Sequence, residues 1–70
     1  MEIKKISSGK LRAIGYDAGA RILEVHLDDG TRLQYSNVGG EVWRRLSGSS
    51  SAWSYYRDNI EEEYNAKRLR

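Results

Sequence analysis

The sequence predicts an α+β domain in which a three-stranded antiparallel meander is followed by two helices packed on one face of the sheet. In the first half of the chain, apolar and polar residues alternate, which is typical of strands with one buried face. In the second half, apolar residues recur every three or four positions, which is typical of amphipathic helices. The length of 70 residues allows one domain, spanning residues 1–70.

The three strands are expected near residues 10–16, 21–27 and 31–36. Between the last two, a three-residue loop at 28–30 pairs Val25 with Leu33 and keeps the apolar side chains on one face, whereas a two-residue turn would mix the faces. The longer loop also puts Gly30 in the left-handed conformation that glycine adopts at low cost. The opposite face of this sheet should then meet water, and it carries Glu24, His26, Arg32 and Gln34.

The register of the first hairpin is open to two interpretations. A four-residue turn at 17–20 puts Ile14 and Tyr16 on the face of Leu23, and a three-residue turn puts Leu11 and Ala13 there. The larger side chains favour the four-residue turn, with a bulge that also turns Leu11 inward. Before this hairpin, Ile3 and Ile6 either extend the sheet or cover its edge, and Ser7 and Ser8 are expected to bond backbone groups where the first strand begins.

The two helices are expected near residues 40–47 and 51–67. Val38, Val42 and Leu46 recur every four residues and indicate the first helix. The second is indicated by apolar residues at intervals of three, four and four, namely Trp53, Tyr56, Ile60 and Tyr64. Acidic residues precede basic ones along this segment, which suits the helix dipole. The serine-rich stretch 47–51 reads as the loop between the helices, and its serines can cap the second one.

Several classes of protein are excluded or disfavoured. The absence of cysteine excludes a disulfide scaffold and a thiolate zinc site, and it fits a reducing compartment, so we expect a cytoplasmic protein. No apolar run approaches the ~20 residues of a membrane span, and no signal-peptide segment follows Met1. His26 and Asp28 supply at most two metal ligands. The consecutive glutamates 61–63 would fan out by about 100° each on a helix and cannot converge on one substrate atom. We therefore expect no enzyme, no metal or cofactor, no small-molecule substrate and no membrane contact.

Four segments together resemble the KTSC domain, a small bacterial and phage domain that also occurs at the C-terminus of some lysyl-tRNA synthetases. They are SSGKLRAIGYD at 7–17, ILEVHLDDGTRLQYSNV at 22–38, VWRRL at 42–46 and YYRDNIEEEY at 55–64. The synthetase association implies an RNA-related role. The chain departs from the family pattern where Gly39-Gly40 replace the usual proline after the valine at 38, and where Glu61 brings a negative charge to the last helix.

The basic residues provide the candidate nucleic-acid site. A sequence pI of about 9.1 with a net charge of +2 fits a small accessory domain that binds RNA weakly, mostly through phosphate. The candidate contacts are Arg44, Arg45, Arg57 and Lys67, with Arg32 as a weaker one that shares the open sheet face with Arg12. A solvated, salt-bridged surface is the competing interpretation of these cations. The alternative function is a protein-interaction or assembly module, such as a homodimer, with Tyr55 as an exposed contact residue.

Overall fold

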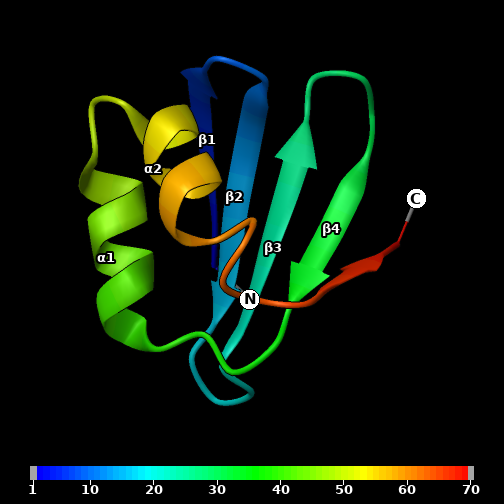
Figure 1. The fold of residues 1–70 in the computed structure, drawn as a ribbon, viewed down its shortest axis with the longest axis vertical. Helices are drawn as coiled ribbons and strands as arrows, with labels where there is room; N and C mark the ends of the chain where they lie inside the picture. Colours follow the sequence, from blue (N-terminus) through cyan, green and yellow to red (C-terminus); the bar gives the residue numbers. More distant parts are fainter. Residues whose placement is uncertain (1, 70) are drawn as a thin grey trace.

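Five strands form one antiparallel sheet, and both helices cover the same face of it (Figure 1). The structure is a computed structural model that describes residues 2–69. The strand order in the sheet follows the order in the chain. The elements are β1 (Glu2–Ser8), β2 (Leu11–Asp17), β3 (Ile22–Leu27), β4 (Arg32–Tyr35), α1 (Gly40–Gly48), α2 (Ala52–Asn59) and β5 (Ala66–Arg68).

The register predicted for the β3–β4 hairpin is confirmed. Val25 pairs with Leu33 across β3 and β4, and Gly30 has a φ of 92° in the loop between them. In the β2–β3 hairpin, Ile14 and Tyr16 lie on the face of Leu23 as predicted, but the prediction of the turn at 17–20 is wrong. Asp17 pairs with Ile22, so the four-residue loop is 18–21, and Tyr16 rather than Ile14 lies opposite Leu23. The register shifts between Leu11 and Ala13, so a bulge turns Leu11 into the core, where it is 2% exposed.

The prediction of three strands is wrong, because β1 and β5 extend the sheet at its two edges. The β1 strand has no single apolar face. Ile3 lies opposite Gly15 and is 49% exposed, whereas Ile6 packs against the core. All three residues of β5 are exposed, so this strand also lacks the apolar alternation that reveals a strand in a sequence.

The second helix is shorter than predicted, because α2 ends at Asn59 and not near residue 67. In a longer helix, Asp58 would face Glu61 and Glu62 one turn further on, and like charges at these spacings destabilise a helix. The chain instead turns at 60–63 and pairs residues 66–68 with the edge of β4. No helix in the described part of the chain is long and apolar enough to cross a membrane.

The core lies between the sheet and the helices. Ile14, Leu23 and Val25 from the sheet are fully buried against residues of the helical half, among them Leu46 and Ile60. The three buried tyrosines contribute their hydroxyl groups to hydrogen bonds inside this core. The Tyr16 hydroxyl donates to the Val38 carbonyl oxygen at 2.6 Å, and the hydroxyl oxygens of Tyr35 and Tyr56 lie 2.5 Å apart. Every buried side-chain nitrogen and oxygen of the described residues therefore has a partner.

The start of α2 is capped from outside the helical half. The N-cap residue Ser51 makes no side-chain hydrogen bond to the helix, so the prediction that the serine-rich loop caps it is wrong. The backbone N–H of Trp53 instead donates to Oγ of Ser8, at the end of β1, over 3.2 Å. The expectation that Ser8 bonds a backbone group is thus confirmed, although that group belongs to a helix 45 residues further on.

Candidate nucleic-acid interface

The face of the sheet opposite the helices carries charged and polar side chains. Residues paired across antiparallel strands point to the same side, so the pairing of the strands identifies the members of this face. We call it the open face, and its described residues are Ile3, Lys5, Ala13, Gly15, Asp17, Ile22, Glu24, His26, Arg32, Gln34 and Lys67. Ala13 and Gly15 provide a low floor at β2, because neither has a side chain longer than a methyl group.

Cations outnumber free carboxylates on the open face. Lys5, Arg32 and Lys67 come from three different strands, and all three are exposed. Its two carboxylates already have partners. Oδ1 of Asp17 accepts backbone N–H groups of the following turn, and Glu24 bonds His26. The positive charge of the open face is therefore available to a ligand, whereas the negative charge is engaged within the protein.

His26 lies in the middle of this charged surface. Its Nε2 is 2.8 Å from Oε1 of Glu24, two residues back on the same strand. Arg32 lies directly opposite His26 on β4, as strand pairing predicts. The two side chains of the His26–Glu24 pair are 21% and 15% exposed, so solvent and ligands can reach both.

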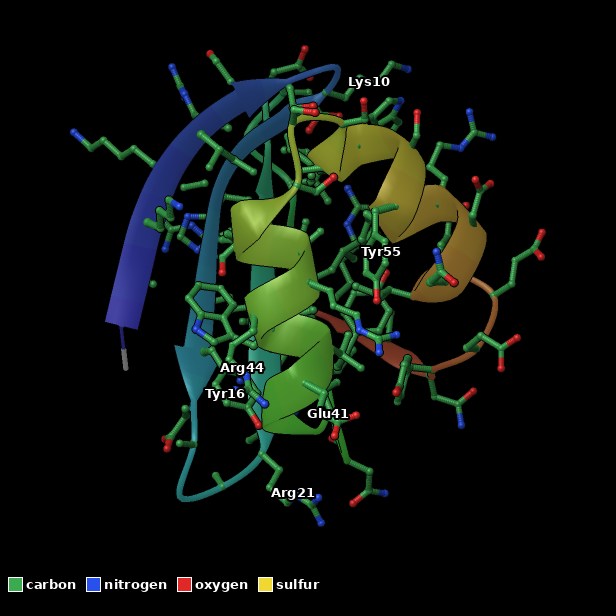
Figure 2. All side chains as sticks on the ribbon, turned by 90° about the vertical axis from the view of Figure 1, so that its left-hand side faces the viewer. Lys10, Tyr16, Arg21, Glu41, Arg44 and Tyr55 are labelled. Atoms are coloured by element: carbon green, nitrogen blue, oxygen red, sulfur yellow. The ribbon has the colours of Figure 1, made fainter. Side chains whose placement is uncertain are left out.

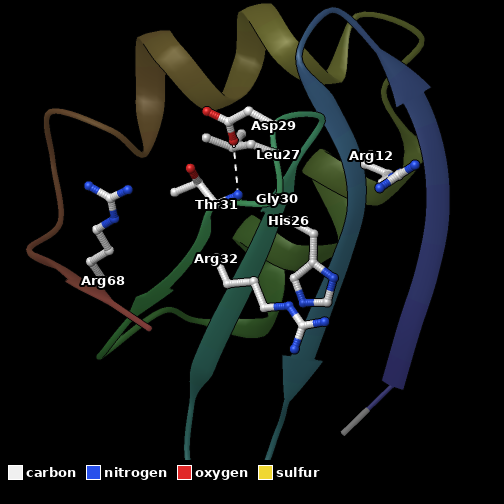
Figure 3. A pocket seen from close by; sticks show the side chains of 8 residues that line it. All are labelled: Arg12, His26, Leu27, Asp29, Gly30, Thr31, Arg32 and Arg68. Carbon is white, nitrogen blue, oxygen red and sulfur yellow. Dashed lines mark hydrogen bonds between the residues drawn. The ribbon is translucent and has the colours of Figure 1, made fainter. Parts of the chain in front are cut away.

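A shallow hollow of about 450 Å³ crosses the end of the β3–β4 hairpin and continues onto the open face (Figure 3). Three arginines contribute to it, and Arg12 joins because the bulge in β2 leaves it as the extra residue of that strand. Its lining consists of Arg12, His26, Leu27, Asp29, Gly30, Thr31, Arg32 and Arg68. A hydrogen bond from Thr31 to Asp29 lowers the pKa of this carboxyl group, and Arg68 adds to the effect. Asp29 is thus held in its charged form within the loop.

The cations predicted to bind RNA do not form one surface. Arg32 and Lys67 lie on the open face, although Lys67 reaches it from β5 and not from a helix. Arg44 and Arg45 are exposed on α1, which covers the other face of the sheet, and they line one hollow with Glu41. Figure 2 shows Arg44 and Glu41 on this helix. Two of the predicted contacts are therefore separated from the helical ones by the thickness of the domain.

Arg57 lies in a third place, with acidic neighbours. Its guanidinium carbon is 5.7 Å from the centre of the Trp53 ring, which is a cation–π distance. The hollow that Arg57 and Trp53 share is also lined by three carboxylates, those of Asp58, Glu61 and Glu62. The negative charge of these carboxylates would repel a phosphate group.

The prediction of an exposed Tyr55 is wrong, because its side chain is half-buried and packs against the core cluster (Figure 2). Sequence reasoning also missed Lys5 on the open face, since a strand at residues 2–8 was only one of two alternatives. Arg68 was not named as a contact, and it lies on β5 and lines the hollow. Arg12 lines the same hollow as Arg32, at the edge of the open face that the two were expected to share.

A family model described as the KTSC domain matches residues 7–64. The chain belongs to the KTSC domain family. No curated protein sequence matches the chain.

A solved KTSC structure has the same architecture. The crystal structure of a KTSC domain protein from Yersinia pestis matches this chain with a TM-score of 0.90 at 21% sequence identity. The match covers 99% of this chain and 97% of that chain. At this level of identity the likeness extends to the α+β fold, with its antiparallel sheet and two helices, and assigns no activity to the domain.

Two residues near the start of the KTSC match have clear structural roles here. Ser8 caps α2, as described above, and Gly9 has a φ of 55° in the turn between β1 and β2. A Cβ atom on Gly9 would lie 2.4 Å from atoms of the Trp53 indole ring. The Ser-Gly pair of this KTSC domain therefore positions the second helix against the sheet, and it does not take part in the charged surface.

Proposed function

We propose that this KTSC domain is a non-catalytic accessory domain that binds RNA weakly, through phosphate contacts on the open face. The observation that carries the proposal is the arrangement of charge there. Arg32 and Lys67, joined by Lys5 and Arg12, present cations from four strands, while Glu24 and Asp17 are engaged within the protein. Exposed cations on a shallow surface suit the phosphate backbone of a nucleic acid.

Recognition of phosphate, with little base readout, follows from the kinds of residue present. None of the described open-face positions carries Trp, Tyr or Phe, and the imidazole ring of His26 is the one aromatic group among them. Arg32 and Gln34 are neighbours on β4 but make a small set for reading base edges. Phosphate contacts position a nucleic acid without selecting its sequence, so we expect similar affinity for unrelated short RNAs.

The absence of catalysis and a cytoplasmic location are parts of the same proposal. The hollow on the open face is shallow and lies at a hairpin end, whereas substrate pockets enclose most of their ligand. Native mass spectrometry after mild purification tests this part. A stoichiometric metal ion or small molecule bound to the domain would contradict it.

The test of RNA binding is an NMR titration of the labelled domain with a short single-stranded RNA at low salt. We expect amide shift changes on β2, β3, β4 and β5 around Arg12, Arg32 and Lys67. The triple variant with alanine at these three positions should bind more weakly. The slope of log affinity against log salt should become about 2 units shallower, because each lost single-strand contact removes about 0.7.

The matched control is the double variant Arg44→Ala with Arg45→Ala, which removes exposed cations from α1 without altering the open face. It should keep the affinity and the salt slope of the unaltered domain. If the α1 variant loses binding and the open-face variant keeps it, the interface lies on the helices. Shift changes scattered evenly over the surface at millimolar RNA would contradict the proposal as a whole.

A second candidate function is favoured by β1, which forms one edge of the sheet over seven residues. An edge strand offers unpaired backbone groups to a partner strand, and Ile3 adds an apolar contact that is 49% exposed. Protein interaction, including self-association, would use this edge and would resist salt. Sedimentation at several protein concentrations separates the two candidates, since a strict monomer argues against self-association.

A further inference from the structure

Building on the proposed RNA-binding function, we propose that binding of RNA phosphate to the open face is coupled to uptake of a proton by His26. The imidazole group would then serve as a pH-dependent phosphate donor beside Arg32. Three features of the site support this coupling. They are the hydrogen on Nε2, the other ring nitrogen Nδ1 and the charges around the ring.

The contact with Glu24 determines which ring nitrogen carries the hydrogen. A carboxylate only accepts hydrogen bonds, so the 2.8 Å contact between Oε1 of Glu24 and Nε2 of His26 requires the hydrogen to be on Nε2. In the neutral ring, Nδ1 therefore has a lone pair and no hydrogen. A phosphate oxygen has lone pairs as well, so neutral His26 offers Nδ1 no attractive contact with RNA.

Protonation turns Nδ1 from a hydrogen-bond acceptor into a donor without disturbing the contact with Glu24. In the imidazolium form both nitrogens donate, so Nε2–H stays on Glu24 while Nδ1–H becomes available to a phosphate oxygen. Arg32 lies directly opposite on β4, and His26, Arg12 and Arg32 line the same hollow. A phosphate bound in this hollow can therefore gain one charge-assisted hydrogen bond when His26 takes a proton from solvent.

The charges around His26 explain why the ligand is needed for the coupling. The charged groups on the strands and the loop around His26 are Lys5 on β1, Arg12 on β2, Glu24 on β3, Asp28 and Asp29 in the following loop, Arg32 on β4, and Lys67 and Arg68 on β5. Cations are the majority of this set, so an RNA phosphate that screens them makes the imidazolium form more favourable. By linkage, lower pH then strengthens RNA binding.

The experiment measures the affinity of the whole domain for a short single-stranded RNA between pH 5.5 and pH 8.0 at constant ionic strength. The oligonucleotide carries hydroxyl groups at both ends, so that no terminal phosphate titrates in this range. We expect affinity to rise about tenfold towards pH 5.5, the effect of one added hydrogen bond to a charged group. Calorimetry at pH 7 in two buffers of different ionisation enthalpy should detect net proton uptake on binding.

The decisive variant is His26→Gln, which keeps a neutral donor for Glu24 and removes the titrating group. Its affinity at pH 5.5 should equal its own affinity at pH 8.0, without the rise at low pH. The control Lys67→Ala should weaken binding at both ends of the range and keep a rise in affinity towards pH 5.5. Affinity independent of pH, or an equal pH dependence in His26→Gln, overturns the inference and leaves the proposed function intact. Absence of RNA binding at every pH overturns both.

Discussion

The placement of α2 depends on a glycine, Gly9, in the turn between β1 and β2. Its φ of 55° lies in the left-handed region that residues with a side chain adopt only at a cost. The same residue lies against Trp53, where an added Cβ would come within 2.4 Å of ring carbons. Two independent requirements, conformation and space, therefore select glycine at this position.

We predict that Gly9→Ala lowers the free energy of unfolding by about 3 kcal/mol, from backbone strain together with overpacking against the indole ring. Urea denaturation followed by tryptophan fluorescence measures the change. Gly40→Ala is the matched control, because nothing lies within 4 Å of the added Cβ and no positive φ is involved. A loss of equal size in both variants would show that the contact with Trp53 does not matter.

At the scale of the elements, the cap of α2 depends on a residue from a distant strand. We predict that Ser8→Ala costs about 1 kcal/mol of stability, since it leaves the Trp53 N–H without its acceptor. Ser51→Ala should change stability by less than about 0.5 kcal/mol, because the Ser51 side chain makes no bond to the helix although it occupies the N-cap position. Thermal unfolding of the two variants gives the comparison. The reverse order would mean that the loop serine caps the helix after all.

Some elements of the fold could be predicted from the sequence, and others could not. The β3–β4 hairpin was predictable because the parity of Val25, Leu33 and Tyr35 favours a three-residue loop that keeps them on one face. Strand β1 stayed one of two alternatives, since Ile3 and Ile6 point to opposite sides of the sheet. The end of α2 was missed because Ile60 and Tyr64 continue the helical spacing into a turn, where the Tyr64 N–H bonds the Ile60 carbonyl oxygen.

The candidate site was predictable only as far as its strands were. Arg12 and Arg32 were expected to share one face, and both line the hollow, Arg12 as the extra residue of the bulge in β2. Lys67 was named as a contact but assigned to a helix, and Lys5 was not named, because both lie on edge strands without an apolar pattern. The bond from His26 to Glu24 depends on side-chain geometry, which alternation alone does not determine.

For the whole molecule, the buried tyrosine pair controls stability in alkali. Burial raises the pKa of Tyr35 and of Tyr56, and their shared hydrogen bond raises that of Tyr56 further. Above pH ~10 the unfolded chain releases these protons while the folded domain retains them. The folded state then binds more protons than the unfolded state, so stability is fully present below pH ~10 and is lost as pH rises beyond it.

We predict that the free energy of unfolding falls above pH ~10 by up to about 2.7 kcal/mol per pH unit, the limiting slope for two protons released on unfolding. Urea titrations at pH 8 to 11.5 measure it. In Tyr35→Phe one of the two groups is gone, and the slope should fall to about 1.4 kcal/mol per pH unit. Lysines titrate in the same range but are unchanged by this substitution, so equal slopes in the two proteins would contradict the role of the pair.

The sequential strand order has a consequence for how the chain folds. Three of the four strand pairings join neighbours across short turns, so little loop-closure entropy is lost when each one forms. Only the pairing of β4 with β5, such as that of Leu33 with Arg68, must wait until the helical segment between them has been brought back to the sheet. This low contact order favours rapid folding, with β5 docking last and its amides opening first to hydrogen exchange. Since β5 carries Lys67, one part of the proposed RNA surface would be the least protected part of the sheet.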